Sequence, residues 1–396
     1  MTTIAAPRSA PRLITPDALE RARRLRDLSD PTQGRHALQL VLDRIVGALA
    51  GRWQSRTILH REDPVVSVHD NYDALHYPAD GVAREARYTR YVTPTTVLRT
   101  HSSAMIPRAL RRLAQREPIR RDVLLVCPGL VYRRDLIDRL HTGEPHQCDL
   151  WRVVQGKLTV DDLEGMIALV VNAVAPGAEY RTIPVRHPYT TDGLQVDVHV
   201  GGEWVEVCEC GRALPALLDE AGLAATWYSG LAMGIGLDRL LMLVKGIDDI
   251  RLLRSEDPRI ATQMLDLTPY SPVSDKPAIR RDLSVAVAED ATAEEIGDRV
   301  RDALGDAAGA LEAVELLSET PLSALPAAAA ARIGMRPGQK NVLLRVVIRD
   351  LARTLTAEEG NALRDRVYAA VHQGTEWQWA AREAHGPLAR QTPGGE

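Results

Sequence analysis

Two arginines in this chain stand in settings that suit phosphate binding. Arg133 lies between an apolar run and a charged loop that extends from Asp135 to Pro145. Arg239 closes the glycine-rich segment Gly-Leu-Ala-Met-Gly-Ile-Gly-Leu-Asp-Arg that begins at Gly230. A planar guanidinium donates two parallel hydrogen bonds to a phosphate, which favours arginine over lysine at such places. The two segments therefore predict a site that holds phosphate groups from two sides.

The residues around each arginine decide how strongly it indicates a phosphate-binding site. An isolated Arg-Arg-Asp cluster is usually a solvated surface turn, and glycine-rich segments also serve the packing of helices and strands. Here the cluster is followed by His141 and by His146-Gln147, while Gly234 and Gly236 permit a ligand to approach the backbone. The combination favours a nucleotide site over two unrelated surface features.

The composition limits the fold and its partners. With 396 residues, of which 45% are apolar, the chain can bury a large core, and its length predicts two domains. The net charge of −4 provides no overall basic field, so nucleic acid would have to bind through local patches. The four cysteines form neither a disulfide framework nor a convincing zinc motif. Without a membrane-length apolar run or a secretion signal, we expect a cytoplasmic protein with an N-terminal tail at 1–30, of which the first 20 residues are frayed.

The hydrophobic patterns predict a mixed α and β domain over residues 31–265. Apolar residues recur at helical spacing in 36–50, which indicates an amphipathic helix. Short runs rich in β-branched residues predict strands at 123–126, 182–185, 194–200 and 204–207. Valines alternate with polar residues in the third run, as in an antiparallel sheet with one face lining a cleft. The segment 230–244 is predicted as a strand that leads into a buried helix.

A linker is predicted to separate this domain from a second one. Prolines at 269, 272 and 277 bracket a stretch without periodicity, so we place the linker at 266–277. Beyond it, capping boxes at Thr292 and Thr356 each open a helix. Strands are predicted at 283–287, 311–317, 342–348 and 377–380, with a surface insertion at 324–331. This repeat of strand, helix and strand predicts a split βαβ domain over 278–385 and a tail over 386–396.

The two arginine segments resemble the second and third signature motifs of class II aminoacyl-tRNA synthetases, and of the phenylalanyl enzymes in particular. The chain is similar over nearly its whole length to the single-chain, mitochondrial-type enzymes. Further matching segments are Asp70 to Leu75, Arg99 to Ser103, Trp204 to Val207, Asp249 to Arg251, Arg280 to Asp282 and Arg353 to Thr356. The resemblance implies an α+β fold: a class II antiparallel-sheet catalytic domain followed by a ferredoxin-like (βαββαβ) anticodon-binding domain.

The resemblance also implies roles for individual residues. Arg133 would bind the α-phosphate of ATP and Arg239 the γ-phosphate, with Asp135, His141 and Gly236 beside the nucleotide. Glu206 would help to hold Mg²⁺, although a lone strand carboxylate is also compatible with a simple solvated position. The residues expected to line the amino-acid site are His101, Ser103, Gln147, Asp149, His187, Tyr189, Glu209 and, at the far end of the side-chain pocket, Ala232.

The chain departs from the phenylalanyl pattern around this expected pocket. The motif Phe-Pro-Phe appears as His187-Pro188-Tyr189, and Leu231 and Met233 replace the two phenylalanines of Gly-Phe-Ala-Phe-Gly. Ile106 replaces a glutamine, and Glu209 replaces a glycine. A carboxylate beside an aromatic pocket is costly without a partner. Glu209 therefore points elsewhere, pairs with His187, or meets a polar group that the substrate brings.

Three functions remain open at this level. The first is a phenylalanyl-type aminoacyl-tRNA synthetase that uses ATP, Mg²⁺ and a phenylalanine-type tRNA, and the second domain favours it. The second is a synthetase-derived ligase or resistance paralogue for another amino acid, which the changed pocket favours. The third, a tRNA-binding regulator without catalysis, is disfavoured because both arginines are present. Cations available to tRNA phosphates in the second domain are Arg280, Arg281, Lys340 and Arg345, although such charges are more often solvated.

Overall fold

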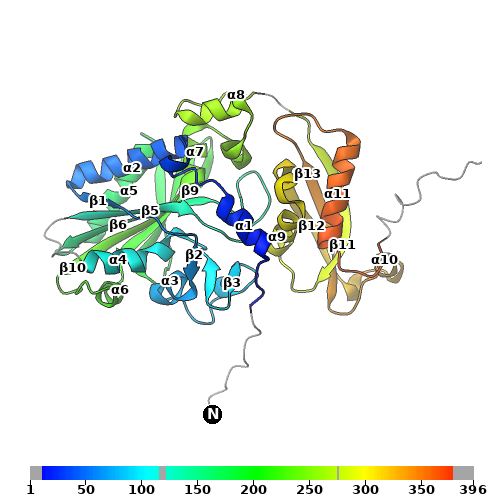
Figure 1. Ribbon diagram of the computed structural model, residues 1–396, viewed down its shortest axis with the longest axis horizontal. Coiled ribbons are helices and arrows are strands. Elements are labelled where there is room, and N and C mark those ends of the chain that lie inside the picture. The colour runs from blue at the N-terminus through cyan, green and yellow to red at the C-terminus, as the bar shows by residue number, and fades with distance from the viewer. Residues whose placement is uncertain (1–10, 116–121, 274–275, 378–396) are drawn as a thin grey trace, which may run out of the picture. The chain divides into compact units, whose positions relative to one another are not determined.

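The computed structural model describes residues 11–115, 122–273 and 276–377, and it divides into two units (Figure 1). The first unit comprises Met1–Arg134 and Thr142–Val273, and the second comprises Asp135–His141 and Ser274–Glu396. The main division thus falls inside the stretch 266–277. Each unit has its own sheet and its own hydrophobic core.

The first unit is built on a seven-stranded sheet. All neighbouring strands in it run antiparallel except β1 and β5, which pair in parallel. The predicted strands and the antiparallel character of the sheet are confirmed. In spatial order the strands are β1 (Arg56–Leu59), β5 (Val123–Leu130), β6 (His146–Gln155), β10 (Tyr228–Gly236), β9 (Glu203–Ala213), β8 (Thr190–Val200) and β7 (Tyr180–Pro184).

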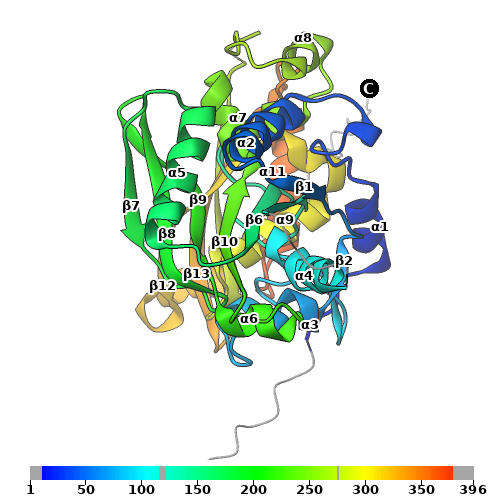
Figure 2. The same cartoon turned by 90° about the vertical axis from the view of Figure 1, so that its left-hand side faces the viewer.

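Helices cover both sides of this sheet, as Figures 1 and 2 show. The helices that pack together on one side are α2 (Ala37–Trp53), α5 (Val160–Val174) and α7 (Leu237–Lys245). Those on the other side are α3 (Val68–Asn71), α4 (Ile106–Ala114) and α6 (Pro215–Glu220), near a small sheet of β2 (Val65–Ser67), β4 (Thr96–Leu98) and β3 (Tyr91–Thr93). Leu38, Ile45 and Leu49 of α2 are fully buried, which confirms the predicted amphipathic helix. Among the helices of the described residues, none combines the length and apolarity needed to cross a bilayer.

The N-terminal region is more ordered than a frayed tail. It contains the helix α1 (Pro16–Arg24), whose N-cap Thr15 accepts a hydrogen bond from the backbone N–H of Ala18 at 3.2 Å. The hydroxyl of Tyr132 donates to the carbonyl of Ala22 at 2.9 Å, and Leu28 is buried. The expectation of frayed residues is therefore wrong for 16–20, because the capped helix and its apolar packing fix them to the first unit.

A buried lysine fixes the chain that follows α7. Lys245 ends α7 and is 1% exposed, and its Nζ donates to the carbonyl of Thr268 at 2.6 Å and to that of Asp266 at 3.0 Å. The short helix α8 (Pro258–Ala261) lies between these two parts of the chain. The beginning of the predicted linker is consequently packed against the first unit.

The second unit has a three-stranded antiparallel sheet with the order β11-β13-β12. Its strands are β11 (Ile279–Ala288), β12 (Leu311–Pro321) and β13 (Gln339–Ile348), and its helices are α9 (Ala293–Leu304), α10 (Ala327–Arg332) and α11 (Ala357–Val371). Both predicted capping boxes form, at Thr292 with Glu295 and at Thr356 with Glu359. A fourth strand was expected at 377–380, but Trp377 lies outside any strand and 378–380 lie outside the described residues.

The loop Asp135–His141 is grouped with the second unit rather than the first. Ile137 is buried in the core of that unit, and its carbonyl accepts a hydrogen bond from the backbone N–H of Val314 at 2.9 Å. Arg301 donates to the carbonyl of Asp135 at 2.6 Å, and Arg139 pairs with Glu312 at 3.1 Å. The expected catalytic domain at 31–265 is therefore interrupted by one loop that belongs to the other core.

The core beneath α4 provides a test of this packing. Leu110 is fully buried among Met105, Trp151 and other apolar side chains, so Leu110→Ala should lower the free energy of unfolding by about 2 to 5 kcal/mol. The control Leu40→Ala changes a residue of α2 that is 38% exposed and should cost less than about 1 kcal/mol. Urea unfolding measures both values. Equal losses would contradict the burial described here.

Candidate functional site

The register of the central strands places the predicted site residues on one face of the sheet. Asp149 of β6 lies opposite Gly234 of β10, which in turn lies opposite Glu209 of β9. Gln147 lies opposite Gly236. Directly opposed residues of antiparallel strands project from the same face, so these positions form adjacent rows. The sequence prediction named all of them, and the register brings them together.

Two glycines of β10 leave the backbone on this face of the sheet uncovered by side chains. A Cβ atom added at Gly236 would meet no atom within 4 Å. At Gly234 the nearest atom would be a carboxylate oxygen of Asp149 at 3.8 Å. The backbone of β10 is therefore accessible between two strands that carry polar side chains. This is the arrangement in which a ligand can lie directly on the sheet.

A bulge turns Glu206 towards the same face. Val196 pairs with Cys208, but the next residue, Asp197, pairs with Glu206, so Val207 is left without an opposite residue. The extra residue reverses the alternation of β9 and gives Glu206 and Glu209 a common face. Burial raises the pKa of Glu206, and the charge of Arg239 opposes that rise.

Both predicted phosphate-binding arginines lie near Glu206. The nearest atoms of Arg239 and Glu206, Nη1 and Oε2, are 3.9 Å apart, which is beyond hydrogen-bond distance. The side chains are 33% and 45% exposed, so this loose contact leaves them open to solvent. The charge of Arg133 also acts on Glu206 and lowers the pKa of Glu209. The two guanidinium groups thus share one acidic neighbour on one face.

A buried histidine links the strand of Gln147 to the helix of Arg239. His146 is fully buried; its Nε2 accepts from the backbone N–H of Leu28 at 3.0 Å, and its Nδ1 lies 2.8 Å from Asp238. Because Nε2 accepts, Nδ1 carries the proton that is donated to Asp238. The carboxylate and the ring therefore hold the first turn of α7 against β6. In the sequence, His146 and Asp238 are only parts of motifs, and this positioning role does not follow from residue spacing.

Asp149 is held in place by three donors. Ser102 and Ser103, from the short helix η4 (Ser102–Met105), donate to its Oδ2 at 2.6 and 3.0 Å, and Trp151 Nε1 donates to Oδ1 at 3.1 Å. Burial raises the pKa of Asp149, and these hydrogen bonds oppose the rise. A carboxylate with its orientation fixed and acceptor capacity remaining is suited to a substrate ammonium group.

Aromatic rings form a wall beside Asp149. Tyr189 packs against Trp151, with ring centres 6.4 Å apart, against Tyr77 at 6.2 Å and against His187 at 5.7 Å. Tyr77 also stacks on His101 at 5.5 Å. Sequence analysis missed Tyr77, although it is the first aromatic residue after the matched segment that ends at Leu75.

The wall continues into apolar core. Ala232, which is 2% exposed, and the fully buried Ile106 belong to the same hydrophobic cluster as Trp151. Ile106 thus lies within an apolar environment, at the position where the phenylalanyl pattern has a glutamine. The surroundings of Ala232, where the far end of the side-chain pocket was predicted, are consequently apolar.

His101 is a neutral group at physiological pH. Burial and, to a smaller extent, the nearby charge of Arg133 lower its pKa to about 4. Its ring contacts Tyr77 face to face and Tyr72 edge to face. A neutral imidazole beside Arg133 can take part in hydrogen bonding without adding positive charge.

Glu209 pairs with His187, which settles one question that the sequence left open. Glu209 Oε2 lies 3.0 Å from His187 Nε2, and His187 Nδ1 lies 3.3 Å from the hydroxyl of Thr190. The hydrogen bond to His187 lowers the pKa of Glu209, so the group is a carboxylate at neutral pH. Its side chain is 45% exposed, against 13% for His187.

The remaining predicted residues lie in the second unit. His141 contacts Asp138 at 2.8 Å, and the role of His141 and Asp135 beside ATP stays a prediction. Of the predicted tRNA-binding cations, Arg345 pairs with Asp282 at 2.9 Å and Lys340 with Glu319 at 2.8 Å. Arg281 donates to Asn361, while the side chain of Arg280 is exposed.

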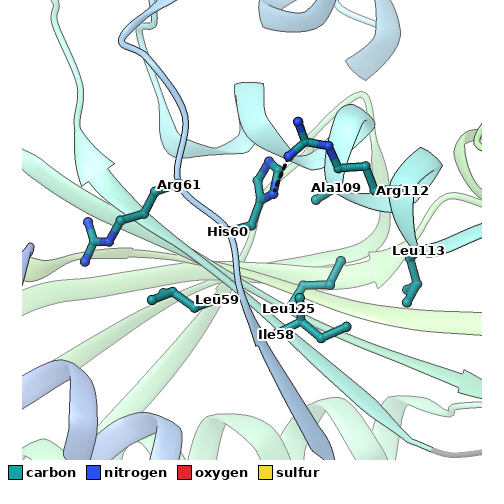
Figure 3. A pocket seen from close by; sticks show the side chains of 8 residues that line it. All are labelled: Ile58, Leu59, His60, Arg61, Ala109, Arg112, Leu113 and Leu125. Atoms are coloured by element: carbon teal, nitrogen blue, oxygen red, sulfur yellow. Dashed lines mark hydrogen bonds between the residues drawn. The ribbon is translucent and has the colours of Figure 1, made fainter. Parts of the chain in front are cut away.

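A separate cavity of about 230 Å³ lies between β1, β5 and α4 (Figure 3). His60 faces Arg112 across it, with ring and guanidinium nitrogens 3.2 Å apart, above Ile58 and Leu125. None of the predicted site residues lines this cavity. Among the described residues, no group of three or more His, Cys, Asp or Glu side chains is arranged to hold a metal ion.

Comparison with known proteins identifies the family. The family model described as "tRNA synthetases class II core domain (F)" matches residues 26–264. The chain belongs to this family. It is 34% identical over 232 residues to the phenylalanine–tRNA ligase α subunit of Nostoc punctiforme, covering 58% of this chain and 67% of that protein. It is also 34% identical over 243 residues to the α subunit of Prochlorococcus marinus strain MIT 9313, covering 60% and 69%.

Two solved structures were matched to part of the chain. One structure of the pyrrolysyl-tRNA synthetase of Desulfitobacterium hafniense has a TM-score of 0.41 and 17% identity, and covers 60% of this chain and 77% of its own. A second structure of that enzyme has a TM-score of 0.43 and 18% identity, and covers 60% and 78%. The resemblance to class II synthetases that the sequence motifs indicated is confirmed by the family match.

The neutral state of His101 predicts a pH dependence of stability. The unfolded chain takes up a proton at this residue below a pKa of about 6.5, whereas the folded chain does so only near pH 4, so acid favours unfolding in this range. Stability should therefore fall between pH 6.5 and 4. His101→Gln should reduce that fall by on the order of 2 kcal/mol.

Urea unfolding at pH 7 and pH 4.5 measures this difference. His69→Gln is the matched control, because the side chain of His69 is 66% exposed and should leave the profile unchanged. An NMR titration that placed His101 near pH 6.5 would contradict the described burial.

Proposed function

We propose that this protein is a phenylalanyl-type aminoacyl-tRNA synthetase that activates an amino acid with ATP and transfers it to tRNA. The observation that carries the proposal is the common position of Arg133 and Arg239 beside Glu206, above the open glycines of β10. Two cations on one open face match the charge of a folded triphosphate. The amino-acid pocket begins next to them, at His101 and Asp149.

Activation needs no nucleophile from the protein. The carboxylate of the amino acid attacks the α-phosphorus of ATP, the bond to the β-phosphate breaks, and pyrophosphate leaves with its electron pair. Arg133 stabilises negative charge at the α-phosphate, and Arg239 holds the γ-phosphate and orients the leaving group. A hydroxyl of the tRNA ribose then attacks the acyl carbon, and AMP leaves.

Magnesium ion fits this site through Glu206. Mg²⁺ in such sites takes one or two carboxylates together with substrate phosphates and water, so a single protein carboxylate is sufficient. When bound, the ion neutralises phosphate charge that two arginines do not balance. Glu206 lies on the same face as both arginines, which supports this role.

The amino-acid site combines fixed polar groups with an apolar end. Asp149 and Gln147 are placed to receive the α-ammonium group, because both project beside the open glycines. The neutral His101 and the hydroxyl of Ser103 border the same space. Ala232 and Tyr189 bound the side-chain pocket at its far end.

The second unit supports tRNA as the acceptor. Apart from the short helix α10 between β12 and β13, its strands and helices follow the order strand, helix, strand, strand, helix, and β13 lies between β11 and β12, as in a ferredoxin-like domain. We propose that this unit, over 278–385, binds the anticodon region through Arg280, Arg281, Lys340 and Arg345. Asp282 and Glu319 would have to release two of these cations.

The alternative of a synthetase-derived ligase or resistance paralogue for another amino acid gains no support from the relatives described above, which are phenylalanine–tRNA ligase α subunits. A regulator without catalysis would not need both arginines on one open face. The comparisons therefore support synthetase chemistry more strongly than they support any particular amino acid.

Amino-acid-dependent exchange of pyrophosphate into ATP tests the activation step. Arg133→Ala and Arg239→Ala should each reduce exchange by at least about 100-fold, because each removes a charged donor from the transition state. Arg259→Ala is the control, since that arginine is exposed and pairs with Asp257. Thermal unfolding verifies that the variants fold. Near-normal exchange in either site variant would refute the assigned role.

Binding and charging of total tRNA test the acceptor. Arg280→Ala should reduce the salt dependence of tRNA affinity, measured as the slope of log K against log salt, by roughly one unit. The control Lys157→Ala removes an exposed cation of the first unit and should leave the slope unchanged. Exchange without any charging of tRNA would favour a different acceptor.

A further inference from the structure

Glu209 places a negative charge in the proposed amino-acid site. It occupies the same row of the sheet as Asp149, with only the open Gly234 between them. A glycine stands at this position in the phenylalanyl pattern, so the charge is a property of this chain. The inference below rests on the proposed function, because it concerns which amino acid that site accepts.

The contact with His187 orients Glu209 but uses only one of its two carboxylate oxygens. One oxygen, Oε2, contacts His187, and His187 is itself held by Thr190 on its other nitrogen. Among the described residues, the second oxygen of Glu209 has no hydrogen-bond partner, and the side chain is 45% exposed. The pair therefore presents a pre-oriented, unsatisfied acceptor to the space above β10.

The groups around this acceptor are also polar at their tips. Tyr77 and Tyr189 both experience the charges of Asp149 and Glu209, and the hydroxyl of Tyr189 lies 3.4 Å from that of Ser103. Their rings stack with His101 and Trp151, which gives the pocket flat aromatic walls. The chain contains no phenylalanine, so each of its aromatic walls carries a polar atom.

The free-energy cost of desolvating Glu209 disfavours the binding of an unsubstituted phenyl side chain. Covering an ionised carboxylate with a hydrocarbon ring removes water from the charge and offers no hydrogen bond in exchange. A substrate with a hydroxyl or amino donor replaces the lost water with a charge-assisted hydrogen bond. A site built to hydrogen-bond a substrate group discriminates strongly against the analogue that lacks it.

We infer that the site selects an aromatic amino acid whose side chain carries a hydroxyl or amino donor, and that Glu209, oriented by His187, recognises this donor. The flat walls accept the ring, and the apolar end at Ala232 and Ile106 limits its length. Glu209 is thus a specificity-determining residue, and His187 is a positioning residue that acts through it.

Pyrophosphate exchange with a matched series of amino acids tests the inference. The series comprises phenylalanine, its three ring-hydroxylated isomers, β-hydroxyphenylalanine and the ring-aminated phenylalanines. At least one donor-bearing member should exceed phenylalanine in kcat/KM by roughly 10- to 100-fold, the worth of a hydrogen bond to a charged group. Calorimetric binding of the same amino acids in the presence of a non-hydrolysable ATP analogue provides a second readout.

Three variants test whether Glu209 and His187 cause the preference for a donor-bearing amino acid. Glu209→Gln should reduce the ratio of the preferred amino acid to phenylalanine, and Glu209→Gly should reduce it further and improve the use of phenylalanine. His187→Gln should lower the ratio through loss of orientation. Asp192→Asn is the control, because it removes the carboxylate of an exposed ion pair with Arg212 on the same hairpin and should preserve the ratio.

The outcomes separate the inference from the proposed function. If phenylalanine is used as well as every donor-bearing amino acid and the ratio is unchanged in Glu209→Gln, the pair only braces the segment around Pro188 and the inference is overturned. Exchange that still depends on Arg133 and Arg239 then leaves the proposed function standing. If no amino acid supports exchange or binds, the proposed function fails, and the inference fails with it.

Discussion

The pairing of β6, β10 and β9 sets the position of the central groups in the proposed site. Asp149, Gly234 and Glu209 share a row only because each strand meets its neighbour in one register. A slip of one residue would turn these side chains into the hydrophobic core beneath the sheet and bring cysteines and large apolar residues to the open face. The apolar face, packed against α2, α5 and α7, excludes that alternative. Burial of one face therefore fixes the chemistry of the other.

Charge is distributed unevenly over this open face. Arg133 and Arg239 gather around Glu206 where the nucleotide phosphates are proposed to lie, whereas Asp149 and Glu209 lie where the amino acid is proposed to lie. His101 stands between the two regions and stays neutral because it is buried beside Arg133. A triphosphate and an amino acid carry complementary charges to these two regions. The buried pair of His146 and Asp238 keeps the first turn of α7, and with it Arg239, in register with β6.

In the second unit, local sequence patterns determine the helices and strands, whereas tertiary packing determines which distant segments join them. Its capping boxes, strands and helices follow directly from local patterns, because a Ser or Thr cap and an alternating strand need only near neighbours. The inclusion of Asp135–His141 in this unit does not follow from such rules, since Ile137 and Arg139 find their partners more than 170 residues away. The acidic partners of Lys340 and Arg345 are likewise neighbours only across the sheet.

The sequence by itself indicated the class II core and most residues of the proposed site, because motifs of arginine, glycine and histidine at fixed spacing suit phosphate chemistry in their residue types. It also identified Glu209 and His187 as departures, but it left open whether they meet. Only the tertiary structure decided that they form a pair, that a bulge turns Glu206 towards Arg239, and that Tyr77 joins the pocket wall. The reason is physical: residue type defines what a group can do, whereas its direction and neighbours depend on strand register and packing between distant segments.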